Sequence, residues 1–317
     1  MTVAFYGEIE FPASRTRSKI LIRRFNKVKT ESGWKKLTDT AEIVFPRKVR
    51  DFDKQKVNEV FQAGDPVIIR LGYNGDLWDE FTGYILQVST GVPVMITCED
   101  EMYKLKRETV SVSKAKCTLK ELLTAIAPGY VIQCDDTALG SVRYSKMLVS
   151  EVLDDLKSKM SLYTYFRGKT LVSGRTSIDG GVHVPIVIEK QAQESLKERS
   201  LEKIYVRVES LQKNGKMLKG EKGEKKGNNI VIKQPNLTPV EIERVVNSTY
   251  DKATKPGLEG DLTLFGIPRL QHGMIADLKS ILYPEKDGSY YIDSVTKTVE
   301  IGQGYRQVAK LGDKTSQ

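Results

Sequence analysis

The segment Phe61 to Val88 reads FQAGDPVIIRLGYNGDLWDEFTGYILQV, and a weaker copy of it recurs at Leu270 to Val295. In both segments a glycine turn enters a strand, a short polar turn follows, and an aromatic-rich strand returns. Chance similarity between two hairpins is the alternative, because strand and turn composition alone produces such matches. We favour duplication of a small β-barrel, which is one way to build a ring. The matched pairs are Gln62 with Gln271 and Gly64 with Gly273 at an offset of 209, and Tyr84 with Tyr291, Ile85 with Ile292 and Val88 with Val295 at an offset of 207.

The length and the cysteine content limit the class of protein. A chain of 317 residues is long enough for two or more domains and needs no disulfide to fold. Cys98, Cys117 and Cys134 are odd in number and include no CxxC pair, so the sequence signals neither a disulfide framework nor a zinc site. We expect reduced, buried thiols.

The apolar runs of the chain are short. No basic segment leads into the roughly 7 to 15 apolar residues of a secretory signal, and Glu8 and Glu10 interrupt the N-terminus. No run approaches the roughly 18 apolar residues of a membrane span. We therefore expect no membrane insertion and a protein made in the cytoplasm.

The chain is basic, with 50 Lys and Arg against 41 Asp and Glu and a net charge of +9. Nucleic acid, an acidic protein partner or solubility alone would each account for this charge. The segment Lys213 to Lys226 holds six lysines and two glutamates but no aromatic residue, whereas single-strand binding sites place aromatic rings among their cations. The pattern predicts a mobile, solvated β-loop, with contact to an acidic surface as the alternative. Its possible partner contacts are Lys213, Lys216, Lys219, Lys222, Lys225 and Lys226.

The first hundred residues have a β pattern. Their short runs are rich in β-branched and aromatic residues and are divided by turn residues. The pair Asn74-Gly75 is the strongest short-range signal for a hairpin. Five or six short strands over residues 1–100 favour a small barrel or a sandwich. The expected strands are 18–23, 41–45, 66–71, 81–88 and 93–98.

Residues 101–178 have mixed periodicity and predict an inserted small α/β module. Thr118 and Glu121 have the spacing of a capping box, and the apolar face that follows predicts a helix ending at Pro128-Gly129. An apolar stripe predicts a second helix over 146–160. A strand over 130–134 and a hairpin that turns at 167–168 complete the module.

The β pattern resumes over residues 179–317 and predicts a second β-barrel. It carries one helix at 238–253, opened by the capping box Thr238 to Glu241, and the Lys/Gly-rich loop 213–228. The expected strands are 183–189, 203–211, 230–233, 261–265, 274–282, 289–297 and 305–311.

No catalytic pattern stands out. His183 and His272 lie far apart in different predicted elements, and each is expected to be a strand or turn residue. The carboxylate pair Asp135-Asp136 fits a turn, and no motif holds a phosphate or a metal. The sequence therefore predicts no catalytic residue, no cofactor and no metal. Tyr73 and its neighbouring aromatic residues would suit a sugar platform, barrel packing or a subunit interface.

The order and spacing of these segments resemble phage baseplate hub proteins, from about residue 18 to 312. Relatives include the late control protein of temperate contractile-tailed phages and the hub portion of type VI secretion spike proteins. The resemblance implies a β-rich α+β fold of two related small tube-type β-barrels with an inserted small α/β module. The similar segments are 61–65, 71–75, 80–85 and 97–100 for the first barrel, 152–157 and 162–168 for the insert, and 264–268, 273, 288–292 and 304–306 for the closing barrel.

The resemblance also implies structural positions within these motifs. They are expected to shape the hairpins of the two barrels rather than to perform chemistry. They are Gly64, Asp65, Gly72, Tyr73, Gly75, Phe81, Gly83, Tyr84, Gly266, Pro268, Gly273, Gly288, Tyr291, Gly304 and Tyr305.

By the same resemblance the protein would be a structural virion component of the tail baseplate and not an enzyme. Such a hub is a homotrimer that joins the hexameric tail tube above to a three-fold central spike below, with wedge or other baseplate proteins outside. DNA would pass through its channel only transiently, and assembly would take place in the cytoplasm of the host bacterium. Several Lys or Arg contacts in the channel would retain the genome, so we expect the segment 213–226 to face outward or toward a neighbouring protein.

Other functions and settings also fit the sequence. A tail-associated cell-wall hydrolase and a basic nucleic-acid-binding β-barrel protein are the alternative functions. The chain shows no spike repeat and no fused lysozyme or peptidase region, so a puncturing tip is expected to be a separate protein. A phage, a prophage-derived particle and an extracellular injection system all fit, as do contractile and non-contractile tails.

Overall fold

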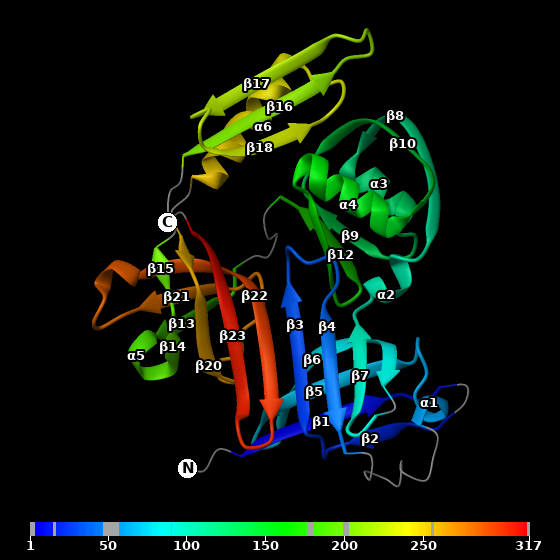
Figure 1. The fold of residues 1–317 in the computed structure, drawn as a ribbon, viewed down its shortest axis with the longest axis vertical. Coiled ribbons are helices and arrows are strands. Elements are labelled where there is room, and N and C mark those ends of the chain that lie inside the picture. Colours follow the sequence, from blue (N-terminus) through cyan, green and yellow to red (C-terminus); the bar gives the residue numbers. More distant parts are fainter. Residues whose placement is uncertain are drawn as a thin grey trace.

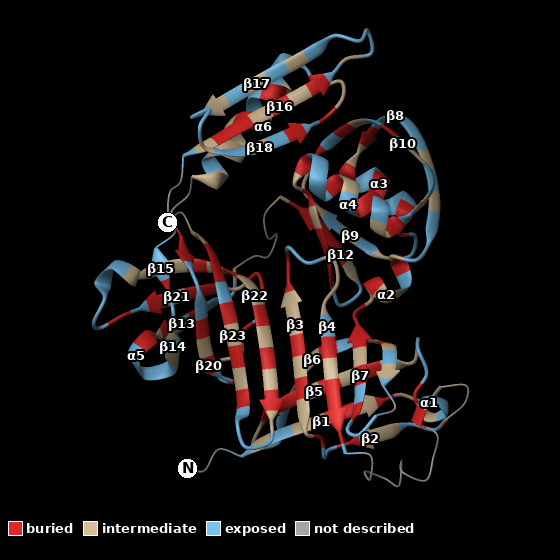
Figure 2. Cartoon of the chain, in the orientation of Figure 1, coloured by how far each residue is buried: buried red, intermediate tan, exposed pale blue. Residues whose placement is uncertain are grey.

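The first β unit contains strands β1 to β7 around a core of its own. The computed structural model describes residues 4–14, 17–46, 57–89, 91–175, 181–198, 203–254 and 257–315. Strands β1, β5 and β6 cross behind β3, β4 and β7 (Figure 1), and buried residues recur along both layers (Figure 2). Alternate side chains of a strand point to one face, so Ile43 and Phe45 of β4 enter the core together with Phe11 and Phe61. The elements are β1 Phe5–Phe11, β2 Ile20–Ile22, β3 Lys27–Gly33, β4 Thr40–Phe45, α1 Val57–Val60, β5 Pro66–Tyr73, β6 Asp76–Ser89 and β7 Val94–Glu99.

The second β unit continues the sheet of the first. Its strand β22 pairs with β3, so hydrogen-bonded neighbours run in the order β14-β20-β23-β22-β3-β4-β7-β6-β5-β1-β2, and β21 lies between β13 and β22. The predicted β-rich α+β class is confirmed, and the two β units form one 13-stranded sheet. The elements are β13 His183–Val187, α5 Ile188–Gln191, β14 Ala192–Glu194, β15 Lys197–Glu198, β19 Leu258–Glu259, β20 Asp261–Phe265, β21 Ile275–Lys279, η2 Pro284–Lys286, β22 Gly288–Glu300 and β23 Gly304–Lys314.

The two repeats share one hydrogen-bond pattern. The Gly64 N–H donates to the Ile85 carbonyl at 2.8 Å, and the Gly273 N–H donates to the Ile292 carbonyl at 2.8 Å. Both glycines have a positive φ, 89° and 86°, which an L-residue adopts only at a cost. A register shift follows Ile85 in β6 and Ile292 in β22. The sequence offsets of 209 and 207 therefore also relate the paired residues of the two hairpins. The pair Pro66 and Tyr84 corresponds to Ile275 and Tyr291, and the pair Ile69 and Phe81 corresponds to Leu278 and Gly288.

The α/β module lies above the first β unit in Figure 1. Its helices bury their apolar faces in one core, and each buried Leu contributes about 1.5–3 kcal/mol. The capping box is confirmed, because the Glu121 N–H donates to Thr118 Oγ1 and the Thr118 N–H donates to the Glu121 carboxylate, both at 3.2 Å. The second helix begins at Val149 rather than at residue 146, since the preceding residues complete a strand. The elements are α2 Met102–Leu105, β8 Thr109–Thr118, α3 Leu119–Ile126, β9 Val131–Cys134, β10 Ala138–Leu148, α4 Val149–Met160, β11 Tyr163–Arg167 and β12 Thr170–Gly174.

Residues 204–253, assigned from the sequence to the second β-barrel, form a sheet and a helix of their own. Helix α6 packs on the sheet through Ile242 and Val246, which belong to a separate small core. Seven of the sixteen residues of the predicted Lys/Gly-rich loop 213–228 form strand β17, which pairs along its whole length with β16. Gly220 has no side chain, which leaves room for Ile242 of α6 against the strand. The elements are β16 Ile204–Leu211, β17 Met217–Gly223, β18 Asn228–Lys233 and α6 Pro239–Ala253.

Candidate functional site at the joint between the β units

The joint between the two β units is a continuous antiparallel ladder. Strand β3 pairs with β22 from Lys27 opposite Glu300 to Gly33 opposite Ser294. Beyond the ladder, the Trp34 indole N–H donates to Asp293 at 2.8 Å, and Lys35 Nζ contacts the same carboxylate at 2.5 Å. Backbone pairing and side-chain contacts thus tie the turn after β3 to the second unit.

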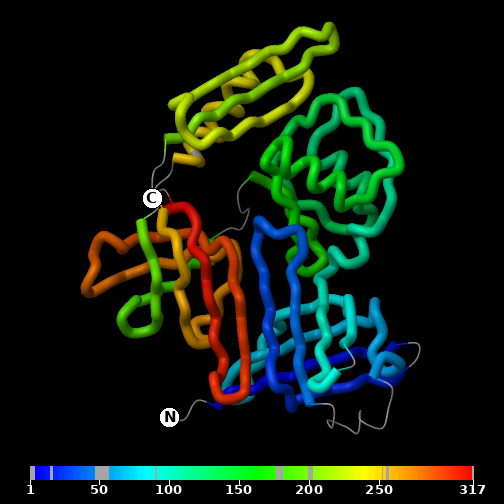
Figure 3. The backbone as a smooth tube through the Cα atoms, viewed as in Figure 1, coloured from blue at the N-terminus to red at the C-terminus, as the bar shows by residue number. Residues whose placement is uncertain are grey.

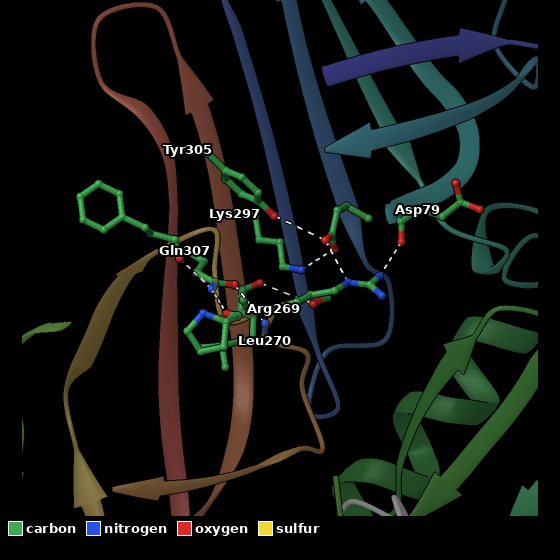
Figure 4. Close-up of polar contacts among 11 residues, drawn as sticks. Asp79, Arg269, Leu270, Lys297, Tyr305 and Gln307 are labelled. Carbon is green, nitrogen blue, oxygen red and sulfur yellow. Dashed lines mark hydrogen bonds and ion pairs between the residues drawn. The ribbon is translucent and has the colours of Figure 1, made fainter. Parts of the chain in front are cut away.

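A buried ionic cluster lies beside this ladder (Figure 4). The Glu80 side chain is 1% exposed and pairs with Lys297, which is 5% exposed. Arg269 Nε donates to the same carboxylate at 3.0 Å, and its Nη2 donates to the Asp79 carbonyl at 2.8 Å. Burial lowers the pKa of Lys297, and the negative charge of Glu80 opposes that shift. The cluster joins charges from both β units, of which Glu80 and Lys297 are buried and Arg269 is 28% exposed. The stability of the buried pair therefore depends on both partners being present.

Aromatic residues form a second contact across the joint. Tyr73, at the tip of the β5–β6 hairpin, stacks on Tyr305 of β23 with ring centroids 5.8 Å apart. The Gly266 N–H donates to the Tyr73 hydroxyl at 3.1 Å. Phe5 meets the Tyr305 ring edge-on at 5.8 Å. Near these rings the Gln307 amide accepts from the Leu270 N–H at 3.1 Å and donates to the Phe265 carbonyl at 2.8 Å. The tip of one repeat is therefore held on the other.

A polar cavity of about 420 Å³ opens where the module meets the joint. The Asp39 N–H donates to Asp100 at 3.2 Å, and His272 Nε2 lies 4.0 Å from the Asp39 carboxylate. Arg167 of β11 donates to the His272 carbonyl at 3.1 Å. Burial raises the pKa of Asp39, with the Asp100 charge as a further cause. Three parts of the chain thus bring acidic and basic groups to one cavity.

Two side chains of this cavity have pKa values displaced in opposite directions. Burial raises the pKa of Asp100 to about 7 and lowers the pKa of His272 to about 4. His272 Nδ1 has no hydrogen-bond partner among the described residues. Burial thus favours the neutral form of both side chains, the protonated carboxyl of Asp100 and the unprotonated imidazole of His272.

The described residues offer little else for catalysis or metal binding. His183 contacts Asp277 at 2.9 Å on the exposed edge of the second unit, far along the chain from the cavity. No group of three His, Cys, Asp or Glu in the described ranges is arranged to hold a metal ion. Of the three free cysteines, Cys98 and Cys117 are buried as expected, whereas Cys134 is only half-buried. No helix within the described part of the chain is long and apolar enough to cross a membrane.

The structure brings some of the motif residues together and leaves others apart. Tyr73, Gly266 and Tyr305 meet at the joint, and Pro268 accepts a hydrogen bond from Gln307 there. Gly64 and Gly273 occupy equivalent corners. The remaining positions lie on strands and turns within one unit, where their expected role stays a prediction. These are Asp65, Gly72, Gly75, Phe81, Gly83 and Tyr84 in the first unit and Gly288, Tyr291 and Gly304 in the second.

The lysines singled out in the sequence lie on the β17 hairpin, far from the joint. Five of them are exposed, and Lys222 is partly covered by α6, where it donates to Asn247 at 2.9 Å. Among the other five, Lys225 lies 3.9 Å from the Glu221 carboxylate. Their contact with a partner stays a prediction.

The charged residues of the joint were not among the residues predicted from the sequence. A signal for Lys297 was present, since it stands between Val295 and Val299 at the inward positions of an alternating strand. A charge at an inward position indicates a buried partner. Nothing nearby in the sequence identifies that partner as Glu80.

Comparison with solved structures finds likenesses over nearly the whole chain. The tail protein from Neisseria meningitidis MC58 has a TM-score of 0.70 at 12% identity, over 98% of this chain and 97% of that one. The 43 kDa tail protein of prophage MuSo2 from Shewanella oneidensis has 0.65 at 12%, over 96% and 98%. An Escherichia coli component of the type VI secretion system has 0.62 at 9%, over 97% and 77%. No protein-family model matches the chain, and no curated protein matches its sequence significantly. The resemblance expected from the sequence is thus confirmed at the level of the fold.

Proposed function

We propose that the protein is a structural hub of a phage or phage-like tail baseplate. Three copies would form a ring in which two β units per chain occupy six positions. Such a ring matches a six-fold tail tube on one side to a three-fold spike on the other. The observation that carries this proposal is the repeat itself, since the hairpins β5–β6 and β21–β22 have matching ladders and the two units already join side by side within one chain.

The rest of the chain has a place in this proposal. A closed ring needs head-to-tail contacts between copies, and permanent contacts of this kind usually bury more than about 2,000 Å². The α/β module and the unit 204–253 project from one end of the sheet in Figure 1 and would meet other baseplate proteins. The exposed lysines of β17 suit an acidic surface on such a neighbour. The likeness to proteins named for tails and for type VI secretion supports this assignment.

Copy number in purified particles tests the hub proposal. Quantitative mass spectrometry of tails should find three copies of this chain for each ring of six tube subunits. Negative-stain images labelled through a tag on this chain should show the label at the baseplate end. Six copies per ring, or label along the whole tube, would contradict the proposal.

The polar cavity favours one alternative, a cell-wall hydrolase. A buried carboxyl with a pKa near 7, such as Asp100, is what a general acid needs. Glycoside hydrolysis requires a second carboxyl across the cleft, and Asp39 lines the same cavity. A peptidoglycan zymogram tests this alternative, because a cleared band lost in Asp100→Asn would establish it in place of a purely structural role.

A further inference from the structure

The joint within the chain has a defined donor strand and a defined acceptor edge. The donor is β3, the edge strand of the first unit, whose other side pairs with β4. The acceptor is the end of β22 from Ser294 to Glu300, beyond the part that β21 covers. A repeated unit carries a copy of each. The second unit should therefore contain an equivalent of the donor strand, and the first unit an equivalent of the acceptor edge. These two equivalents indicate which strands the outer edges of the chain can pair with.

The copy of β3 in the second unit is the pair of short strands β14 and β15. Glu194 faces Leu262 on β20 as Val28 faces Ile43 on β4. Lys197 of β15 faces Glu259 of β19, which continues the register of β14 on β20. The far edge of β14 and β15 carries no ladder among the described residues. The Leu196 N–H is held by the Glu194 side chain at 2.5 Å, so pairing at this edge falls mainly to Lys197 and Glu198.

The copy of the acceptor edge in the first unit is the end of β6. Strand β5 covers β6 from Asp76 to Tyr84, as β21 covers the start of β22. Residues Gln87 to Ser89 correspond to Ser294 to Thr296, which receive β3 in the second unit. In the described part of the chain their edge away from β7 has no strand beside it. An unpaired edge next to a matching donor is a template for strand addition.

Exposed apolar side chains accompany both outer edges. Across the internal joint a hairpin tip, Tyr73, packs on Tyr305 at the start of β23. In the first unit Val94 of β7 faces Phe45 of β4, and in the second unit Gln307 of β23 faces Leu264 of β20, so Val94 and Gln307 are equivalent. Two residues earlier, Val92 is therefore equivalent to Tyr305. Val92 is 80% exposed. The tip of the equivalent hairpin in the second unit carries Ile281 and Leu282, which are 62% and 67% exposed.

We propose that a second copy of this chain covers these surfaces, with β15 of one copy pairing antiparallel to the end of β6 of the next. By the register of the internal joint, Lys197 lies opposite Ser89 and Glu198 lies opposite Val88. The tip at Ile281 and Leu282 then packs on Val92 of the next copy. The inference rests on the proposed ring and adds the residues that close it. Because each contact repeats one already made inside the chain, three copies form six similar joints.

Cysteine cross-linking of the full-length protein tests the register. Residues directly opposite in an antiparallel pair have Cα atoms about 4.5–5.5 Å apart, which a disulfide spans. In assembled protein the variant Lys197→Cys/Ser89→Cys should form covalent trimers under mild oxidation. The control Lys197→Cys/Thr82→Cys should not, because Thr82 lies on the part of β6 that β5 covers. The unsubstituted chain gives the background from its own three cysteines.

The outcomes separate this inference from the hub proposal. Particles with three copies of the chain could fail to cross-link at 197 and 89, or could cross-link equally in the control. Either result would overturn the strand pairing but would not contradict the hub proposal. The absence of three-copy assemblies would overturn both. A second pair of variants tests the apolar contact without altering β6 or β15. Val92→Glu should weaken trimer formation at least roughly tenfold, and Val131→Glu, at a 67% exposed valine of the module, should leave it unchanged.

Discussion

At the scale of single residues, Glu80 is the most sensitive position of the joint. Its carboxylate is buried and balances the buried Lys297 and the partly exposed Arg269. Removing one partner from a buried ion pair usually costs about 3–5 kcal/mol, because the remaining charge stays buried. We predict that Glu80→Gln lowers the free energy of unfolding by about that amount, measured by urea denaturation.

Two further variants separate the effect of burial from that of charge. Glu224 pairs with Lys203 at 2.7 Å on the surface, where both side chains are mostly exposed. Glu224→Gln should leave the urea midpoint nearly unchanged. The double variant Glu80→Gln/Lys297→Met should recover much of the loss, since no unpaired lysine then remains. Equal effects of Glu80→Gln and Glu224→Gln would show that the joint is solvated.

The raised pKa of Asp100 has a consequence for stability against pH. An ordinary Asp titrates near pH 4, whereas burial raises the pKa of Asp100 to about 7. Between these values the folded chain keeps a proton that the unfolded chain has lost, so this group's contribution to stability falls as pH rises. His272 acts with the opposite sign. Its pKa is lowered to about 4, so its contribution is lost as pH falls below its ordinary 6.5.

We therefore predict that Asp100→Asn becomes more stable relative to the wild type as pH rises from 5 to 8. The relative gain should be on the order of 2 kcal/mol, measured as the difference in free energy of unfolding at each pH. Asp154→Asn, at an exposed carboxylate on α4, should follow the wild-type profile. A constant difference between wild type and Asp100→Asn at every pH would show that Asp100 is charged throughout.

At the scale of elements, the two glycine corners give a test of the repeat. Gly64 and Gly273 have φ near +90° and donate the same hydrogen bond to the returning strand. A Cβ in this region costs about 1–2 kcal/mol. We predict that Gly64→Ala and Gly273→Ala destabilise the protein by similar amounts, measured by thermal unfolding.

Gly91 is the matched control for the two corners. It lies in a turn, has no positive φ, and a Cβ there would lie 3.7 Å from its nearest neighbour. Gly91→Ala should therefore have little effect on the melting temperature. A large fall in melting temperature for only one of the two variants would mean that the two corners contribute differently to stability despite their matching backbones.

The elements that the sequence predicts well are those fixed by local chemistry. Capping boxes at Thr118 and Thr238 and the Asn74-Gly75 turn each depend on residues a few positions apart. Strands β1 and β3 were not predicted: each pairs on one side with a nearby strand, β2 or β4, but on the other side with a strand far along the chain, β5 or β22, so half of its pairing has no local signal. The exposed strand β17 was read as a loop, since lysine and glycine disfavour strands when neighbours are unknown.

The joint could be predicted only in part. Its aromatic contact involves Tyr73 and Tyr305, which the family resemblance singled out, although the contact itself was not foreseen. The ion pair of Glu80 and Lys297 joins residues 217 positions apart. The β3–β22 ladder joins the two units that carry them, and that ladder has no local signature in the sequence.

At the scale of the whole molecule, the repeat explains where the unit 204–253 belongs. In the first β unit a short turn, 34–39, connects β3 to β4. The equivalent strands of the second unit are β15 and β19, which lie side by side. The chain leaves and rejoins the second unit at this one end (Figure 3), so the unit is an insertion in the equivalent turn. Its contacts elsewhere include Gln234 Nε2, which donates to the Ala138 carbonyl of the module at 2.7 Å.

An insertion whose ends are adjacent can be removed with little strain on its host, because the closing loop is then short. We predict that replacing residues 203–254 with a linker of about four Gly and Ser residues leaves both β units folded and shifts the melting temperature by only a few degrees. Three-copy assembly, measured by mass, should persist because the proposed β15–β6 contact is retained. Replacing 34–39 with the same linker is the matched control and should destabilise the joint, because Trp34 and Lys35 both bind Asp293. Unfolding of the first variant would contradict the insertion and make the unit 204–253 part of the second β core.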